Sequence, residues 1–393
     1  MTDRVHRALL PAGLKDVLPP DAESEASVRE TLISAFVSRG YDRVKPPLIE
    51  FEDSLVSGSG EATSSQTFRM MDPVSQLMLG VRPDMTLQVA RIATTRLVDE
   101  PRPLRLSYAG EVLRVRGSSL RPERQFAQVG AELIGSDKPE ADAEVILMAG
   151  EALNAAGADG LSVDLGLPTL VAAICREHGV DPQGNDGVLR GALNQKDAAA
   201  IKQFGGPAAP VLGELLEAAG GAASAIERIN GIGLPDDAER EWSHLVSVAE
   251  IVKRRAPSLE LTIDPVEIRG YEYHSGVTFT IFAKSARGEL GRGGRYVAGN
   301  GAETAGEAAT GITLFLDTVI RSLPASPQPK RIYLPTGSSP EDARRLRAEG
   351  WITVPSLSAE EDGAHRAQAL GCTHILVEGE ASEIDAGGDA RDG

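Results

Sequence analysis

The stretch RQFAQVGAELIG, residues 124–135, places two polar side chains in an otherwise apolar run. Gln128 and Glu132 are four residues apart, a spacing that suits one face of a helix. The dense apolar content and the glycines at 130 and 135 favour a buried strand instead. In a strand, positions 128, 130 and 132 lie on one face, so this stretch predicts a buried surface that carries an amide, a glycine and a carboxylate.

Three other apolar segments also carry unlike polar groups: RPDMT (82–86), EVLRVR (111–116) and IRGYEYHSG (268–276). A buried carboxylate or arginine is costly unless it is paired. For any one residue the simplest interpretation is internal pairing, in which Arg114 or Arg269 neutralises a glutamate such as Glu132. Together the four segments favour a ligand with both charges, such as an amino acid, because its amine requires carboxylates and its carboxylate requires a cation.

The stretch GRGGRY, residues 291–296, opens a glycine-rich region. It matches neither the dinucleotide-binding spacing nor the P-loop, so a phosphate cradle and a flexible turn ahead of a helix both fit it. We expect a glycine-rich loop over 291–311 and an apolar helix over 311–323. Patterns typical of serine hydrolases or zinc proteases are missing from the sequence.

The remaining periodicity predicts an α+β protein with two parts. Amphipathic helices are expected at about 22–39 and 138–157, and residues 168–256 indicate a mostly helical, acidic insertion. The stretch PASPQPK, residues 324–330, is typical of a linker. Alternating strands and helices after it predict a small α/β unit over 330–393 that ends in a disordered tail.

Composition limits the setting and the partners. The net charge of −17 opposes a nucleic-acid partner, because neutralising phosphates supplies much of the affinity in such complexes. Cys175 and Cys372 lie in unrelated contexts, which favours neither a disulfide nor a metal site. Without a membrane-length apolar stretch or a signal-like start, we expect a cytoplasmic protein with no membrane partner, no metal and no other cofactor.

The order of several segments resembles the histidyl-tRNA synthetases, a family of class II aminoacyl-tRNA synthetases, over roughly residues 10–321. The resemblance implies an antiparallel sheet flanked by helices over residues 1–323, with the helical insertion at about 168–256, a dimer, and a truncated α/β domain at 330–393. The segments that carry it are PAGLKDVLPP, GVRPDMTLQVAR, GEVLRVRG, RQFAQVGAELIG, EIRGYEYHSGVTF and GRGGRY.

The same resemblance implies a histidine pocket. Glu132 would read the imidazole, while Asp84 and Thr86 would receive the α-amino group. Arg269 would lie at the carboxylate, and Arg114 matches the arginine of the family's first phosphate motif. The residues that we expect to bind histidine are Asp84, Thr86, Arg114, Gln128, Glu132, Arg269, Tyr273, His274 and Tyr296.

Other positions depart from the synthetase pattern. Arg116 stands where the family has a glutamate, and Phe315 where it has a glycine beneath ATP. Thr318 follows Asp317 where the family has an arginine, and Arg321 lies one helical turn further along. Residues 330–393 hold 7 basic and 12 acidic residues, a poor surface for tRNA.

A retained histidine pocket with altered ATP and tRNA elements resembles a paralogous family, the regulatory subunits of ATP phosphoribosyltransferase, the first enzyme of histidine biosynthesis. This resemblance implies a non-catalytic subunit in a hetero-oligomer with a short-form catalytic subunit, with histidine as feedback effector. The alternatives are a divergent histidyl-tRNA synthetase and a stand-alone enzyme that binds or transfers amino acids.

Overall fold

The structure is a computed structural model that describes residues 9–56, 64–117, 121–181, 184–268, 273–299, 306–324, 329–358 and 363–384. It divides into two compact units, Met1–Pro324 and Ala325–Gly393. Arg269, most of the polar loop at 57–67 and residues 385–393 of the expected disordered tail lie outside the described residues.

Within the described residues, nine strands of the first unit form one large sheet in the order β1-β5-β6-β12-β11-β10-β7-β9-β8. The pairs β1–β5 and β7–β9 are parallel and the other pairs are antiparallel. This sheet, with its helices, confirms the predicted fold class. Its strands are β1 (Asp42–Arg43), β5 (Leu104–Leu113), β6 (Gln125–Ile134), β7 (Leu161–Gly166), β8 (Gly220–Gly221), β9 (Glu260–Asp264), β10 (Thr278–Ala283), β11 (Gly291–Ala298) and β12 (Glu307–Phe315).

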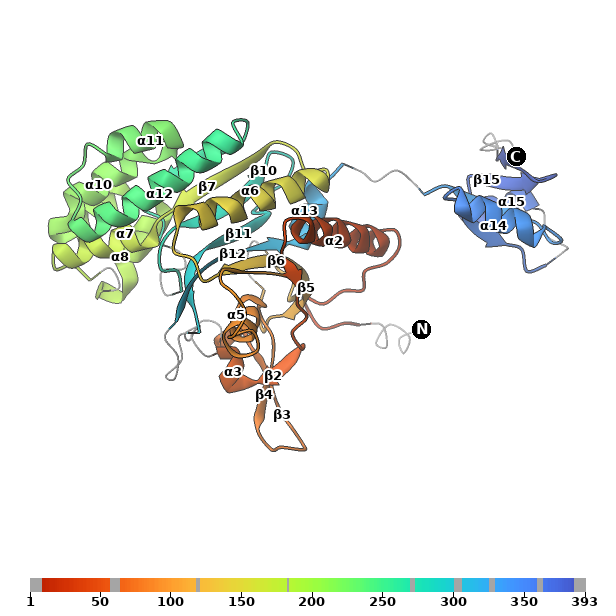
Figure 1. The fold of residues 1–393 in the computed structure, drawn as a ribbon, viewed down its shortest axis with the longest axis horizontal. Coiled ribbons are helices and arrows are strands. Elements are labelled where there is room, and N and C mark those ends of the chain that lie inside the picture. Colours follow the sequence, from red (N-terminus) through yellow and green to blue (C-terminus); the bar gives the residue numbers. More distant parts are fainter. Residues whose placement is uncertain are drawn as a thin grey trace. The chain divides into compact units, whose positions relative to one another are not determined.

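A smaller antiparallel sheet and several helices complete this part of the unit. The smaller sheet has the order β2-β4-β3 and consists of β2 (Ile49–Phe51), β3 (Phe68–Met71) and β4 (Met78–Val81). Figure 1 shows α6 and α12 on one face of the large sheet and α5 with the smaller sheet on the other side. The helices here are α2 (Asp21–Ser38), α3 (Glu52–Val56), α5 (Thr86–Thr95), α6 (Pro139–Ala155) and α13 (Leu316–Ser322).

The mostly helical content predicted for residues 168–256 is confirmed, with the two-residue strand β8 as the exception. Its last helix, α12, has acids in its first turn and bases in its last, which complements the helix dipole. The helices are α7 (Pro168–Glu177), α8 (Gly184–Gln195), α9 (Ala198–Phe204), α10 (Ala209–Ala218), α11 (Ala222–Ile229) and α12 (Asp236–Arg255), with a 3-10 turn at Gly206–Ala208.

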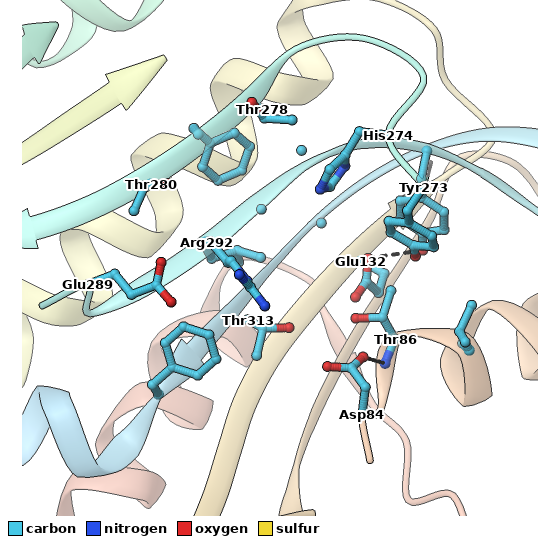
Figure 2. Close-up of a pocket in the computed structure, with 18 of the residues that line it drawn as sticks. Asp84, Thr86, Glu132, Tyr273, His274, Thr278, Thr280, Glu289, Arg292 and Thr313 are labelled. Atoms are coloured by element: carbon cyan, nitrogen blue, oxygen red, sulfur yellow. Dashed lines mark hydrogen bonds between the residues drawn. The ribbon is translucent and has the colours of Figure 1, made fainter. Parts of the chain in front are cut away.

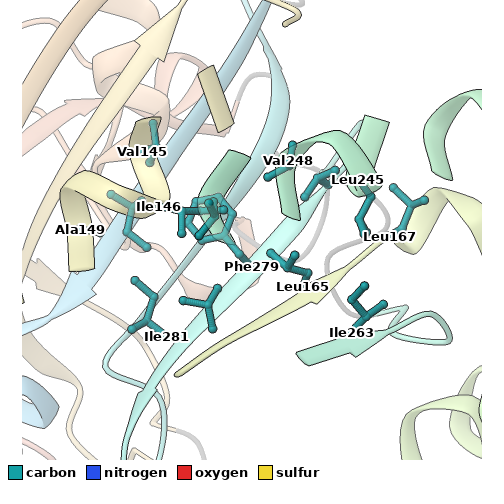
Figure 3. Close-up of a cluster of buried hydrophobic side chains, with 14 of the residues drawn as sticks. Val145, Ile146, Ala149, Leu165, Leu167, Leu245, Val248, Ile263, Phe279 and Ile281 are labelled. Atoms are coloured by element: carbon teal, nitrogen blue, oxygen red, sulfur yellow. The ribbon is translucent and has the colours of Figure 1, made fainter. Parts of the chain in front are cut away.

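The core of the first unit lies where α6 and α12 pack against the large sheet (Figure 3). Ile146 of α6, Val248 of α12 and Phe279 of β10 meet there, and each is at most 1% exposed. Burying an apolar side chain of this size stabilises the fold by about 1.5 to 3 kcal/mol. This core therefore fixes the sheet strands against the helices on one face, and leaves the opposite face available for a site.

The expectation of a loop over 291–311 and a helix over 311–323 is wrong. Residues 291–298 and 307–315 are the adjacent strands β11 and β12, and the helix is limited to Leu316–Ser322. The glycines serve close packing rather than a loop: a Cβ at Gly293 would lie 2.0 Å from the Gly311 carbonyl oxygen. Glycine inside a strand often marks such a close approach.

The second unit is a four-stranded sheet with the order β14-β13-β15-β16. Strand β13 is parallel to β14 and β15, whereas β16 is antiparallel to β15. The predicted alternation of strands and helices is confirmed, and β16 is an addition to it. The elements are β13 (Arg331–Leu334), α14 (Pro340–Ala348), β14 (Ile352–Pro355), α15 (Gly363–Ala369), β15 (His374–Val377) and β16 (Glu380–Glu383).

Candidate functional site

A cavity of about 450 Å³ opens on the face of the large sheet that lies away from the core. It is bounded by strands β6, β11 and β12, by the start of α5 and by residues 273–280. Figure 2 shows Glu132, Tyr273, His274 and Asp84 gathered at one end, and Glu289 with Arg292 at the other. Seven of the nine expected site residues line the cavity: Asp84, Thr86, Arg114, Glu132, Tyr273, His274 and Tyr296.

Glu132 is a buried carboxylate at the floor of this cavity, with 1% of its surface exposed. The hydroxyl groups of Tyr108 and Tyr296 each donate a hydrogen bond of 3.0 Å to it. Burial raises the pKa of Glu132 to about 8, although these two hydrogen bonds partly oppose the rise. Within the described residues no arginine or lysine forms an ion pair with Glu132, so a charge on this carboxyl group would have no internal cation.

Tyr108 of β5 connects several polar groups beneath the cavity. Its hydroxyl lies 3.1 Å from Thr86 Oγ1 and 3.0 Å from Thr313 Oγ1. Because the tyrosine donates its single proton to Glu132, the two threonines donate to the tyrosine. The carboxylate is therefore oriented by a buried network that spans β5, β12 and α5.

Two glycines make room for this arrangement. Tyr108 faces Gly130 across β5 and β6, and a Cβ at Gly130 would lie 2.4 Å from the tyrosine hydroxyl. Gly311 faces Glu132 across β6 and β12, and a Cβ there would lie 1.7 Å from Glu132 Oε2. Since any other residue would overlap the carboxylate or its partner, both positions require glycine.

Asp84 is held at the mouth of the cavity, immediately before α5. Its Oδ1 accepts from the Thr86 amide at 2.9 Å, and its Oδ2 accepts from Gln128 Nε2 at 2.9 Å. The Gln128 side-chain oxygen in turn accepts from the Met85 amide at 3.2 Å. Gln128 is fully buried and does not line the cavity, so it orients Asp84 rather than facing the cavity as expected.

Three aromatic rings form the wall opposite Asp84. Tyr273 stacks on Tyr296 with ring centroids 5.3 Å apart, and contacts His274 edge to face. The Tyr273 hydroxyl is buried without a hydrogen-bond partner among the described residues. Burial lowers the pKa of His274 to about 4, so its ring is neutral near pH 7. Its Nδ1 lies 3.2 Å from the Arg295 carbonyl oxygen and donates to it, which leaves Nε2 as an acceptor.

Arginines and phenylalanines border the other end of the cavity. The Arg114 Nε donates to the Pro83 carbonyl at 3.2 Å, and its guanidinium lies 5.0 Å from the centre of the Phe126 ring. The Arg121 guanidinium lies 3.8 Å from the centre of the Phe315 ring. Phe315 lines the cavity and is 1% exposed, and Phe126 and Arg121 pack against its ring.

Seven of the nine residues expected from the sequence line the cavity, but several of the residues around them were not expected. Internal pairing of Arg114 with Glu132 does not occur, because Arg114 bonds the Pro83 carbonyl instead. Arg269 lies outside the described residues, so its place is not assigned. Tyr108, Thr313, Arg121 and Arg292 were not anticipated. The available signal for Tyr108 was that it is a single tyrosine in its strand and that the strand paired with it has a glycine, Gly130, at the facing position.

Metal-binding groups and membrane-spanning helices are absent from the part of the chain that the structure describes. No group of three or more histidine, cysteine, aspartate or glutamate side chains there is placed to hold a metal ion. Both cysteines are free and buried. Among the same residues, the helices are too short or too polar to cross a membrane.

Comparison with known proteins places this geometry in a family. The family model for histidyl-tRNA synthetase matches residues 13–319. A protein of Paramagnetospirillum magneticum named ATP phosphoribosyltransferase regulatory subunit is 54% identical over 376 residues, covering 96% of this chain and 98% of its own. One of the same name from Rhodospirillum centenum is 53% identical and covers 96% of each chain.

Solved structures agree with this assignment. A crystal structure from Bacillus halodurans, described as an ATP phosphoribosyltransferase regulatory subunit/histidyl-tRNA synthetase, has a TM-score of 0.80 at 25% identity and covers 94% of this chain and 97% of its own. Histidyl-tRNA synthetase from a Nostoc species shares the fold, with a TM-score of 0.77 at 15% identity over 97% and 95% of the two chains. The chain therefore belongs to the family of ATP phosphoribosyltransferase regulatory subunits and has the fold of histidyl-tRNA synthetases.

Proposed function

We propose that this chain is a non-catalytic subunit that binds histidine in the cavity and conveys feedback inhibition to a short-form ATP phosphoribosyltransferase catalytic subunit. The observation that carries the proposal is Glu132, a buried carboxylate that faces the cavity with two tyrosine donors and no internal cation. A buried acid of this kind favours a ligand that brings its own N–H donor or positive charge.

The polar side chains that line the cavity match the groups of an amino acid. An imidazole N–H would donate to Glu132, and an α-ammonium group would lie against Asp84 and Thr86. Arg269 would lie at the ligand carboxylate, as the resemblance to the synthetases implies, and Arg114 would add a second guanidinium to the cavity. Gln128 would contribute indirectly, by holding Asp84 in place. The residues proposed to contribute to histidine binding are Asp84, Thr86, Arg114, Gln128, Glu132, Arg269, Tyr273, His274 and Tyr296.

The size of the cavity is consistent with a small ligand. Its volume of about 450 Å³ lies within the range of about 300 to 1,000 Å³ that is usual for small-molecule sites. Aromatic walls such as the Tyr273–Tyr296 stack exclude water around a planar ring. Exclusion of water strengthens a hydrogen bond between the ligand and Glu132.

Support for a non-catalytic role comes from the other end of the cavity. Amino-acid activation needs cations placed on the ATP phosphates. Here Thr318 stands where the synthetases have an arginine, and it accepts from Arg121 Nη2 at 3.2 Å. Phe315, where the synthetases have a glycine, lines the cavity here and carries the Arg121 guanidinium on its ring. A divergent histidyl-tRNA synthetase is the alternative, and histidine-dependent exchange of label between pyrophosphate and ATP would establish it.

The relatives are named as subunits, so we propose that this chain also acts in a complex, as a homodimer within a hetero-oligomer. Feedback requires histidine to bind the active and inhibited complexes with different affinities. The coupling is reciprocal for binding, so substrate of the catalytic subunit would weaken histidine binding in the same proportion. The acidic net charge of −17 disfavours a nucleic-acid partner, and we propose a cytoplasmic setting.

Calorimetry with histidine tests the binding proposal on the purified chain. We expect Glu132→Gln to weaken histidine binding at least about tenfold, because losing one charged partner in a buried pair costs on the order of 2 kcal/mol or more. The matched control is Glu111→Gln, which removes another part-buried carboxylate of the same sheet that does not line the cavity. Equal affinity in the two variants would show that histidine does not contact Glu132.

A phosphoribosyl-transfer assay on the reconstituted complex tests the regulatory role. Glu132→Gln should still activate the catalytic subunit, and inhibition should require a higher histidine concentration than with the wild-type chain. Inhibition of both complexes at the same histidine concentration would place the regulatory site on the catalytic subunit.

A further inference from the structure

Arg295 and Tyr296 are consecutive residues of β11, so their side chains leave the strand on opposite faces. Tyr296 points into the cavity and donates to Glu132. Arg295 points to the other face, where its guanidinium reaches α6 and the turn before it. One strand therefore connects the cavity with the helical side of the sheet.

The Arg295 guanidinium is held by a buried ion pair. Its Nη2 lies 2.5 Å from Asp142 Oδ2, and the Asp142 side chain has no exposed surface. The same guanidinium donates to the carbonyl groups of Ser136 at 3.0 Å and Lys138 at 3.1 Å. Because a buried charge that loses its partner is costly, this pair strongly constrains where β11 lies.

The backbone of Arg295 passes this constraint to the cavity wall. Its amide donates to the Val277 carbonyl at 2.8 Å, and its carbonyl accepts from the Ser275 amide at 2.9 Å. The same carbonyl accepts from His274 Nδ1 at 3.2 Å. The position of Arg295 therefore sets the position of residues 274–277.

The helical insertion contacts this ion pair through His244 of α12. His244 Nε2 lies 2.8 Å from Asp142 Oδ2, the same oxygen that accepts from Arg295. Asp142 Oδ1 is buried without a hydrogen-bond partner among the described residues. Within that part of the chain, the side chains that hold the carboxylate are thus Arg295 and His244, and the second belongs to the insertion.

We infer that His244 is a positioning residue through which the helical insertion sets the cavity wall, by way of Asp142 and Arg295. A movement of α12 that withdraws His244 would leave the Asp142 carboxylate bound by Arg295 alone. Arg295 and residues 274–277 would then be held less firmly. By reciprocity, a ligand that orders this wall also restrains α12. The ligand part of this inference rests on the proposed function, whereas the positioning part does not.

Hydrogen exchange on the ligand-free full-length chain tests the positioning part. His244→Leu removes the donor while keeping a side chain of moderate size, and His244→Gln keeps an N–H donor at a similar place. We expect the amides of Ser275 and Arg295 to exchange about tenfold faster in the leucine variant, equivalent to about 1.4 kcal/mol, the scale of one charged hydrogen bond. The glutamine variant should return close to the wild-type rate.

Amides of β5 serve in the same experiment as a reference for global unfolding. If the leucine variant exchanges as slowly as wild type at these two amides, or if the leucine and glutamine variants behave alike, His244 does not position the wall. If β5 accelerates by the same factor, the effect is a general loss of stability and the inference is equally wrong.

Histidine titration then tests the ligand part. We expect histidine to slow amide exchange within α12 in the wild-type chain and in His244→Gln, but not in His244→Leu. The leucine variant should also bind histidine about tenfold more weakly, because its cavity wall is loosened. Histidine binding to wild type without any change in α12 would overturn the coupling. Failure of wild type to bind histidine, with the ligand-free result as expected, would overturn the proposed function and leave the positioning role supported.

Discussion

Glu132→Gln should change how the stability of the ligand-free chain depends on pH. The pKa of Glu132 is raised from its ordinary value of 4.5 to about 8 by burial. Between these two values the unfolded chain has released the proton while the folded chain still holds it. Unfolding is therefore favoured as pH rises through this window, and the stability present below pH 4.5 is lost progressively up to about pH 8.

The size of the effect follows from the linkage relation. Within the window, each pH unit lowers the free energy of unfolding by about 1.4 kcal/mol for one such group. From pH 5.5 to 7.5 the wild-type chain should lose about 2 to 3 kcal/mol relative to Glu132→Gln, whose amide does not titrate. The variant should therefore gain stability over wild type as the solution becomes more alkaline.

Urea unfolding at pH 5.5, 6.5 and 7.5 provides the assay. Of the two tryptophans, Trp242 is buried in the first unit and Trp351 lies in the second, so a Trp351→Phe background makes fluorescence report on the first unit. The control is Glu307→Gln, because the hydrogen bond from Arg102 lowers the pKa of Glu307 and its titration ends below this range.

A difference between wild type and Glu132→Gln that stays constant from pH 5.5 to 7.5 would refute the reasoning. It would mean that Glu132 has the same protonation state in the folded and unfolded chains, and that its burial carries no penalty for the charge. The Glu307→Gln difference should be constant in either case.

Two further substitutions test the packing around the carboxylate. Gly311→Ala should lower the free energy of unfolding by about 2 kcal/mol or more, because the added Cβ would overlap Glu132. The control Gly213→Ala lies in open space on α10 and should instead stabilise the fold by about 0.5 to 1 kcal/mol. Equal shifts of the thermal unfolding midpoint in the two variants would contradict the overlap. Tyr108→Phe should cost about 1 to 3 kcal/mol in urea unfolding, because it leaves Glu132 without one donor in a buried site, and an unchanged midpoint would show that the hydroxyl is dispensable.

Elements with strong local periodicity could be predicted from the sequence. The strand over Gln128 and Glu132 was recognised because the dense apolar content and the glycines at 130 and 135 favour a buried strand, and the structure has β6 there. The helical content of residues 168–256 was recognised because the segment is rich in alanine and acidic residues, and the structure has helices α7 to α12 there. The alternation of strands and helices in the second unit was predicted from equally local sequence patterns, apart from the short strand β16.

Features that depend on contacts between distant segments were not accessible in this way. The glycines of 291–296 suggested a loop, because a glycine-rich run has the same local appearance whether it is mobile or tightly packed. In the fold, Gly293 lies against the backbone of β12 with no room for a side chain. Pairing of Arg114 with a glutamate was the simplest interpretation of that residue alone, but in the fold Arg114 lines the cavity and donates to the Pro83 carbonyl.

The sequence alone determined the family, the order of most elements and seven of the side chains that line the cavity, because each of these is written in residue types at short spacing. The tertiary structure decided what those side chains do. Glu132 holds its proton near neutral pH because strands from separate parts of the chain bury it beneath Tyr108 and Tyr296 and bring no cation to it. Such desolvation depends on the strand order of the whole sheet, and no short stretch of residues contains that information.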